Sequence, residues 1–164
     1  MKCGKILRLL QIACIGLVTL MPASAHAAQN ARINNLSDVD FGSIANFSID
    51  QTSSQSVCVY STFPSSLYHI TATGSGSGGA FTLSSGSDTM AYEVQWANTS
   101  GQTSGTSLTA GVALNGLTSN ATASGCTSGP STSASLITIL RTAAIGAAIS
   151  GSYTGTLTLL VAPN

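Results

Sequence analysis

An all-β sandwich is the fold class that the sequence predicts, and three observations support this prediction. Apolar and polar residues alternate with period two in many segments, which is the pattern of strands that bury one face. These segments are short and numerous, as they are in sandwiches. Runs rich in Gly, Ser, Asn and Thr separate them and are typical of turns, as in TGSGSGGA, SSGSDT and NTSGQTSGT.

Residues 1–27 are typical of a secretory signal that is removed from the mature protein. A basic start precedes an apolar run over residues 9–21 and Ala-His-Ala at 25–27, where small residues suit a signal peptidase. A retained membrane anchor is one alternative, but the run is shorter than the roughly 20 residues that a span needs. A lipoprotein anchored at Cys14 is another, but more apolar sequence follows that cysteine. Cleavage after Ala27 would leave residues 28–164 as one domain.

The expected strands of this domain follow one another along the chain. They are DVDFG at 38–42, SVCVY at 56–60, LYHITATG at 67–74, AFTL at 80–83, MAYEVQWAN at 90–98, SLTAGVAL at 107–114 and SLITIL at 135–140. The clearest is 90–98, because its alternate side chains Met90, Tyr92, Val94 and Trp96 fall on one face. The stretch LITILRTAAIGAAISG has the Ala-rich spacing of a helix, but it also contains Gly146 and Gly151. We therefore expect a strand followed by an irregular crossing there.

The closing stretch GSYTGTLTLLVAPN has the alternation of a half-buried strand. One face carries Tyr153, Leu157, Leu159 and Val161, and the other carries Thr154, Thr156 and Thr158. An unpaired apolar edge promotes aggregation unless something covers it. We expect the last strand to take a partner either from earlier in this chain or from another molecule.

Few charges remain after processing. Two Arg stand against five Asp and Glu, and there is no Lys, so the net charge of residues 28–164 is near −3. Nucleic acid is therefore excluded as a partner, because phosphate binding depends on clustered Lys and Arg. A surface this poor in charge is unlike that of a typical soluble monomer. It suggests that partners cover much of it.

Cys58 and Cys126 are the two cysteines left after processing. An even pair in an exported protein favours a disulfide over a metal or redox site. The sequence has neither a CxxC redox pair nor the His and Cys neighbours of a zinc site. A bridge that closes a loop of nearly seventy residues would stabilise the fold by roughly 4 kcal/mol in the chain-entropy account.

No enzyme motif stands out. The GxSxG elbow, the HExxH pair and the P-loop lysine are absent. We interpret His69, the single histidine of the mature chain, as structural, and Asp38 and Asp40 as solvent-facing edge residues and not an acid pair. Tyr92 and Trp96 could stack a sugar, but a Trp among alternating apolar positions favours the core. The sequence predicts a protein that is not an enzyme and uses no cofactor, metal or small-molecule substrate.

Five motifs carry a resemblance to a known family. They are VDFGSI at 39–44, SVCVYS at 56–61, YHITATGSGSGGAF at 68–81, AYEVQW at 91–96 and SGSYTGTLTLLV at 150–161. In this order, and over essentially the whole mature chain, they resemble the spore coat protein U domain family, which includes the subunits of archaic chaperone-usher pili. Two positions depart from the family pattern: no Cys precedes the FG motif to pair with Cys58, and Gly155 replaces the usual acidic residue of the closing motif.

The resemblance implies an incomplete immunoglobulin-like sandwich that lacks one strand. A periplasmic chaperone would fill the gap first, and the N-terminal extension of the next subunit would fill it afterwards. The implied partners are that chaperone, an outer-membrane usher and other pilus subunits, and the implied location is the cell surface after export through the periplasm. We expect the groove to be lined by Val39, Phe41, Tyr153, Leu157, Leu159 and Val161.

The leading function is therefore a structural pilus subunit. An adhesive module at a pilus tip, which would bind a receptor or glycan, and a cell or spore coat protein are the alternatives. The segment AQNARINNLS offers only Ile33 and Leu36 as large apolar residues, and their spacing of three places them on opposite faces of a strand. We expect a subunit that accepts a donor strand but donates one poorly, which corresponds to a tip or minor position.

Overall fold

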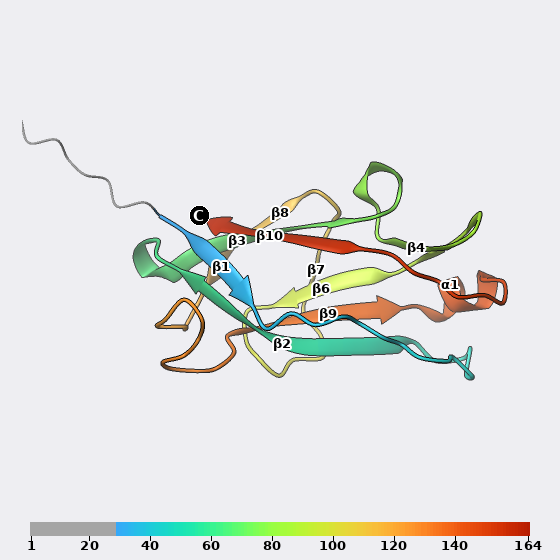
Figure 1. The fold of residues 1–164 in the computed structure, drawn as a ribbon, viewed down its shortest axis with the longest axis horizontal. Helices are drawn as coiled ribbons and strands as arrows, with labels where there is room; N and C mark the ends of the chain where they lie inside the picture. Colours follow the sequence, from blue (N-terminus) through green and yellow to red (C-terminus); the bar gives the residue numbers. More distant parts are fainter. Residues whose placement is uncertain (1–28) are drawn as a thin grey trace, which may run out of the picture.

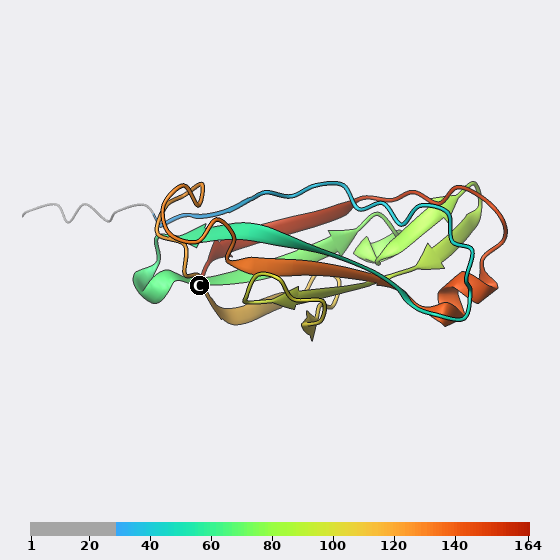
Figure 2. The same ribbon diagram turned by 90° about the horizontal axis from the view of Figure 1, so that it is seen from below.

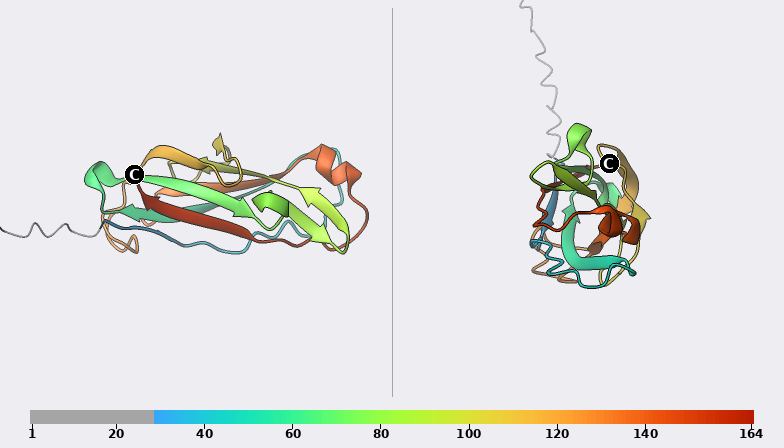
Figure 3. Two further views of the ribbon diagram at one scale, coloured as in Figure 1. Left: turned by 90° about the horizontal axis from the view of Figure 1, so that it is seen from above. Right: turned by 90° about the vertical axis from the view of Figure 1, so that its right-hand side faces the viewer.

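The computed structural model describes residues 29–164, which form an antiparallel β-sandwich (Figure 1). The predicted secretory signal lies outside the described residues. Two sheets pack face to face and give an elongated body, and Figure 2 shows the two layers from the side. The views along and across the body in Figure 3 place the α1 end opposite the end at which the chain enters β1. The predicted fold class is confirmed.

The larger sheet has five strands in the order β1-β2-β9-β6-β7. Their bounds are Ala31–Asn34 for β1, Gln51–Ser61 for β2, Ala134–Leu140 for β9, Glu93–Ala97 for β6 and Thr106–Ser107 for β7. All neighbours are antiparallel. The central strand β9 is buried along its whole length. Its outer face is partly covered by the loop after β6, since the Ser135 hydroxyl donates to the Thr99 carbonyl oxygen and accepts from the Gln102 amide.

The smaller sheet has three antiparallel strands in the order β10-β3-β8, and a separate hairpin joins β4 to β5. Their bounds are Leu157–Pro163 for β10, Leu67–Gly74 for β3, Ala113–Thr118 for β8, Thr82–Ser85 for β4 and Asp88–Ala91 for β5. Short helical turns are η1 at Pro64–Ser66, η2 at Ser77–Gly79 and α1 at Thr142–Ala147. No helix among residues 29–164 is long and apolar enough to cross a bilayer.

The core lies between the two sheets and follows the predicted alternation. Met90, Tyr92, Val94 and Trp96 are all buried, as expected from their shared face. They pack with alternate residues of the neighbouring strands, namely Val57, Val59, Tyr68, Ile70, Ala72, Leu136 and Leu140. The prediction that Trp96 belongs to the core, and not to a sugar-stacking surface, is confirmed.

A series of hydrogen bonds runs from the core to the surface, from Trp96 of β6 to Thr118 of β8. The Trp96 indole N–H donates to the Tyr68 hydroxyl at 3.1 Å, and that hydroxyl donates to the Asn98 side-chain oxygen at 2.8 Å. The Asn98 amide in turn donates to the Thr118 hydroxyl. Burial raises the pKa of Tyr68 to about 12. The buried polar atoms of Tyr68 and Trp96 thus both have partners, which offsets the cost of removing them from water.

Two predicted strands and one predicted crossing are corrected by the structure. The stretch 90–98 is two strands, because the Tyr92 amide donates to the Phe81 carbonyl next to β4 while β6 pairs with β9. The stretch 107–114 is interrupted, because the Val112 amide donates to the Thr109 carbonyl in a turn that carries the chain from one sheet to the other. The crossing after β9, expected to be irregular, contains the six-residue helix α1.

The predicted strand at 38–42 is also wrong. Residues 35–50 form no strand, although β1 precedes them and β2 follows them. The domain's first strand is instead β1, within the segment AQNARINNLS, and Ile33 packs against the core. The closing strand begins at Leu157, later than predicted, while Thr154 makes an isolated antiparallel bridge with Ser84 of β4.

Gly155 allows the chain to pass from this bridge into β10. A Cβ atom at Gly155 would lie 2.9 Å from the Thr82 carbonyl oxygen and 3.0 Å from Leu83 Cδ2. Contacts this short force neighbouring atoms to move. No larger side chain fits there without rearrangement, which accounts for glycine at a position where the resembled family has an acidic residue.

Candidate functional site: an open groove beside strand β10

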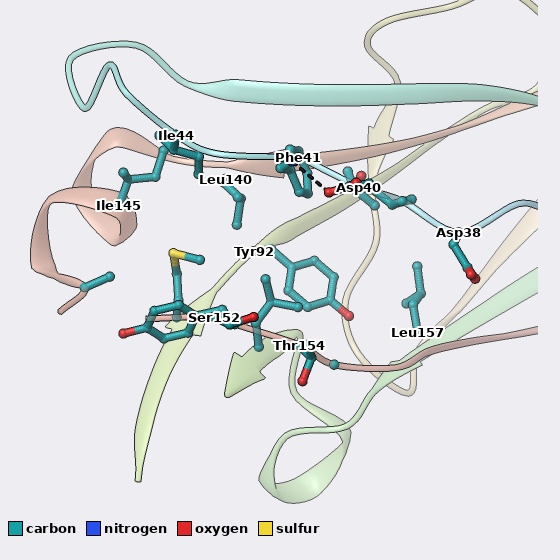
Figure 4. A pocket seen from close by; sticks show the side chains of 18 of the residues that line it. Asp38, Asp40, Phe41, Ile44, Tyr92, Leu140, Ile145, Ser152, Thr154 and Leu157 are labelled. Atoms are coloured by element: carbon teal, nitrogen blue, oxygen red, sulfur yellow. Dashed lines mark hydrogen bonds between the residues drawn. The ribbon is translucent and has the colours of Figure 1, made fainter. Parts of the chain in front are cut away.

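A cavity of about 1200 Å³ opens along one edge of the sandwich, toward the α1 end. One wall is the strandless segment from Leu36 to Ile44, and the other runs from Ala148 into β10 as far as Leu159. Figure 4 shows Asp38, Phe41 and Ile44 on the first wall and Ser152 and Leu157 on the second. This cavity is called the groove below.

The floor of the groove is the apolar core. It is formed by Met90, Tyr92, Leu136, Leu140 and Ile145, which are at most 9% exposed. Burial raises the pKa of the Tyr92 hydroxyl, and Phe81 packs against its ring at a centroid distance of 5.7 Å. Both walls add half-buried apolar side chains that pack on this core, namely Phe41, Ile44, Tyr153, Leu157 and Leu159. The groove thus offers apolar contacts along its whole length.

The first wall has free backbone groups. Within the described chain, no amide or carbonyl of residues 35–49 makes a hydrogen bond to another backbone group. The segment is held by side chains instead: the Ser37 amide donates to the Gln55 side-chain oxygen, and the Gly42 amide donates to Asp40 Oδ1. Apart from the groups of Ser37 and Gly42 that are bonded to side chains, the backbone groups of this wall are available to another strand.

The second wall also has a free edge. Strand β10 pairs with β3 on one side and, in the described part of the chain, has no strand on the other. Its side chains alternate as predicted: Leu157 and Leu159 are half-buried toward the core, whereas Leu160 is 60% exposed. The groove therefore lies between two stretches of backbone that can each bond to an inserted strand.

The groove is closed at one end and open at the other. At the closed end β1 contacts β10, next to the C-terminal residue (Figure 1). At the open end the exposed side chains of Phe47 and Ile149 line the mouth, next to α1. Val161 lies beyond the groove, further along β10, where it packs against the core.

An ion-pair cluster joins the elements at the open end. The guanidinium of Arg141 donates to Asp50 at 2.8 Å and to Glu93 at 2.5 Å, and the Thr142 amide donates to Asp50. The Thr142 N–H, followed by the Arg141 guanidinium, lowers the pKa of Asp50. The hydrogen bond from Arg141 lowers the pKa of Glu93, and the two carboxylates raise the pKa of Arg141. Because all three groups are exposed, the cluster fixes geometry more than it adds stability.

The disulfide lies at the opposite end. Cys58 of β2 and Cys126 are bonded, as predicted, and both are buried. They form a small cluster with Ala121 and Tyr60, separate from the main core. The bond fastens the long loop before β9 over the outer face of β2. Among residues 29–164 there is no group of three His, Cys, Asp or Glu side chains placed to hold a metal ion.

Of the six residues predicted to line a strand-accepting groove, five do line this cavity: Val39, Phe41, Tyr153, Leu157 and Leu159. The sequence did not assign the floor residues Leu136, Leu140 and Ile145, or the mouth residue Phe47, to this site. The alternation at 90–98 could have suggested Tyr92 as a floor residue, since it marks a buried face. Nothing in the sequence placed α1, and hence Ile145, beneath the groove.

A solved structure has a similar fold. A chain in a solved chaperone–tip adhesin complex, described for its part in CFA/I fimbriae biogenesis, matches this sandwich with a TM-score of 0.54 and 18% sequence identity. The match covers 82% of this chain and 42% of that chain. This protein thus spans less than half the length of the chain that it matches.

Comparisons of the sequence alone give no match: no family model matches it, and neither does any curated protein. The structural likeness therefore supports the sandwich fold alone.

Proposed function

We propose that this protein is an exported structural subunit of a pilus, related to the spore coat protein U domain family, and that its groove binds a β-strand from another protein. One observation carries this proposal. An apolar floor lies between the edge of β10, which has no neighbouring strand in the described chain, and residues 36–44, which make no backbone–backbone hydrogen bond.

A β-strand is the ligand that satisfies both features. Its backbone can bond to the edge of β10 and to the opposite wall, and its alternate side chains can reach the floor. A small molecule would leave most of the free amides and carbonyls without partners. The wall from Leu36 to Ile44 is long enough for a strand of the usual five or six residues.

The two edges of the smaller sheet differ in a way that supports this choice. On β8 the register shifts opposite Tyr68 and Ile70, and Gly116 has a φ of +73°, so this edge is irregular. Such bulges prevent other chains from pairing with an edge. Strand β10 pairs with β3 in unbroken register from Leu157 to Pro163. The regular edge is the one that borders the groove.

Several partners follow from this function. A periplasmic chaperone would occupy the groove first, another subunit would replace it, and an outer-membrane usher would carry the subunits to the cell surface. The likeness to a chain from a chaperone–tip adhesin complex supports a chaperone as partner. The buried disulfide supports export, because such bonds persist outside the cytoplasm.

A minor or tip position in the pilus is part of the proposal. Residues 31–34 belong to the protein's own sheet as β1, paired with β2, and Ile33 packs against its own core. Because these residues already pair within this sheet, they make a poor donor strand for a neighbouring subunit. The structure of β1 therefore supports a subunit that accepts a strand more readily than it gives one.

A strand supplied in cis tests the proposal without an identified chaperone. A short flexible linker and a nine-residue strand with alternating Val and Thr are appended after Asn164, so that the chain can fold back along β10. Filling the groove should raise the thermal midpoint by roughly 10 °C, since each added kcal/mol shifts a domain of this size by a few degrees.

Two adjacent residues provide the matched control. Leu159→Asp places a charge in the groove and should abolish the gain from the appended strand, whereas Leu160→Asp places the same charge on the exposed face and should preserve it. No gain in the parent protein, or an equal loss in both variants, would count against the groove as a strand-binding site.

A further inference from the structure

The groove is charged on one side only. Among residues 29–164, Asp38 and Asp40 are the only charged residues that line it, and both are exposed on the wall formed by residues 36–44. The facing wall presents hydroxyl groups at its rim, from Ser152, Thr154 and Thr156. Figure 4 places Asp38 and Asp40 across the groove from Ser152 and Thr154.

No cation of the described chain balances these two carboxylates. Arg141, at the open end, is already engaged by Asp50 and Glu93. Arg32 lies on β1, outside the residues that line the groove. The two carboxylates therefore give the rim a net negative charge.

The carboxylates of Asp38 and Asp40 would lie beside the outward face of a strand inserted in the groove. Asp38 and Asp40 are both exposed, whereas Phe41 is half-buried. Phe41 packs on the core at the floor. A strand lying beside this wall would turn its apolar residues to the floor and its outward residues to the level of the two carboxylates.

We propose that the strand which fills the groove is cationic on its outward face, with Lys or Arg at two positions, two residues apart, that pass Asp38 and Asp40. This inference rests on the proposed function and specifies the chemistry of the partner. Opposite charges on neighbouring strands strengthen pairing by roughly two- to fivefold in affinity for each pair. They also speed the encounter in a manner that salt suppresses.

Synthetic strands test the inference directly. Three labelled nine-residue peptides carry Val or Ile at every second position and differ only at the outward positions, which hold Lys, Ser or Glu. Their affinity for the mature, disulfide-bonded protein is measured by fluorescence anisotropy at low and high salt. The Lys strand should bind roughly tenfold more tightly than the Glu strand, with the Ser strand between them, and 1 M NaCl should remove most of the difference.

Three single substitutions show which carboxylates cause the preference for the Lys strand. Asp38→Asn and Asp40→Asn should each weaken binding of the Lys strand by roughly two- to fivefold. Asp88→Asn removes the same charge from a residue of β5 that does not line the groove, and it should weaken binding far less. An equal effect of all three would assign the preference to the overall charge of the protein and overturn the inference.

The outcomes separate this inference from the function on which it rests. If none of the three peptides binds, the groove does not accept strands, and the proposed function fails together with the inference. If all three bind with equal affinity, the groove accepts strands, but the inference about their charge is wrong.

Discussion

The two ends of the sandwich differ in how completely their apolar side chains are buried. At the end that carries the disulfide, which we call the closed half, Val57, Val59, Tyr68 and Trp96 are at most 1% exposed. At the end that carries the groove, the open half, the wall residues Phe41, Tyr153 and Leu157 are only half-buried, and Leu36 and Val39 are 45% and 37% exposed. The core of this chain is thus fully enclosed in one half and partly exposed in the other.

The closed half maintains the fold, and the open half carries the proposed binding site. The closed half has full packing, satisfied polar groups and a covalent bond, so it can hold the fold while the groove is empty. The open half exposes apolar side chains and free backbone, which is costly for an isolated protein and useful for one that assembles. The predictions below test this division, beginning with the largest expected effect.

Removing the disulfide should cause the largest loss, since it acts on the half that maintains the fold. In the double variant Cys58→Ser, Cys126→Ser, the bridge across a sequence separation of 68 residues is lost. We expect the free energy of unfolding to fall by about 4 kcal/mol in urea titrations. Equal urea midpoints for the oxidised and reduced parent proteins would show that the bond does not carry the closed half.

Removing one hydroxyl from each half compares them directly. Tyr68→Phe leaves the Trp96 N–H and the Asn98 oxygen of the closed half without their partner, and should cost about 1 to 3 kcal/mol. Tyr153→Phe removes an exposed hydroxyl of the open half that donates to the Ile149 carbonyl, and should cost less than about 0.5 kcal/mol. Similar losses in chemical denaturation would contradict the division between the halves.

The open half is nevertheless tightly packed around Gly155. Alanine substitutions at Gly155 and at Gly146, which has open space around it, should therefore have opposite effects. Gly155→Ala places a methyl group 2.9 Å from the Thr82 carbonyl oxygen and should destabilise the fold by about 1 to 3 kcal/mol. Gly146→Ala, in helix α1 with open space around its Cα, should stabilise it by about 0.5 to 1 kcal/mol. Thermal midpoints that shift in the same direction would refute this account of Gly155.

The smallest expected effect is the response to acid. The folded-state pKa values of Asp50 and Glu93 are lowered by Thr142 and Arg141, so their contribution is present above the unfolded pKa of about 4 and is lost as pH falls below it. Arg141→Gln should make unfolding midpoints less dependent on pH between about 5 and 3. Arg32→Gln, on β1, should not; an unchanged profile for the Arg141 variant would contradict the role given to the cluster.

The closed half could be predicted from the sequence because its signals are local. Alternation at 90–98 and 135–140 identified strands that bury one face, and the cysteine count identified the disulfide. The sequence did not predict the two positions, Tyr92 and Gly155, at which the chain leaves one sheet for another. At Tyr92 the break depends on a hydrogen bond to Phe81, and at Gly155 it depends on the closeness of Thr82, and neither partner is a neighbour in sequence.

The open half explains the error at 38–42. Val39 and Phe41 have the alternation of a strand, and the sequence predicted one. The structure gives this segment no backbone partner, so no strand forms. A sequence pattern specifies which face a strand would bury, but a strand also needs a neighbour with which to bond. In our account that neighbour belongs to another protein.

Amide hydrogen exchange, resolved by residue, tests the central claim most directly. It is measured on the mature protein alone and on the variant with the appended strand. We expect the amides of β9 to exchange slowly in both proteins, and those of residues 36–44 and the free edge of β10 to exchange rapidly alone and to become protected when the strand is present. Protection of these amides in the protein alone, or no change on adding the strand, would contradict the claim that the groove is an empty strand position.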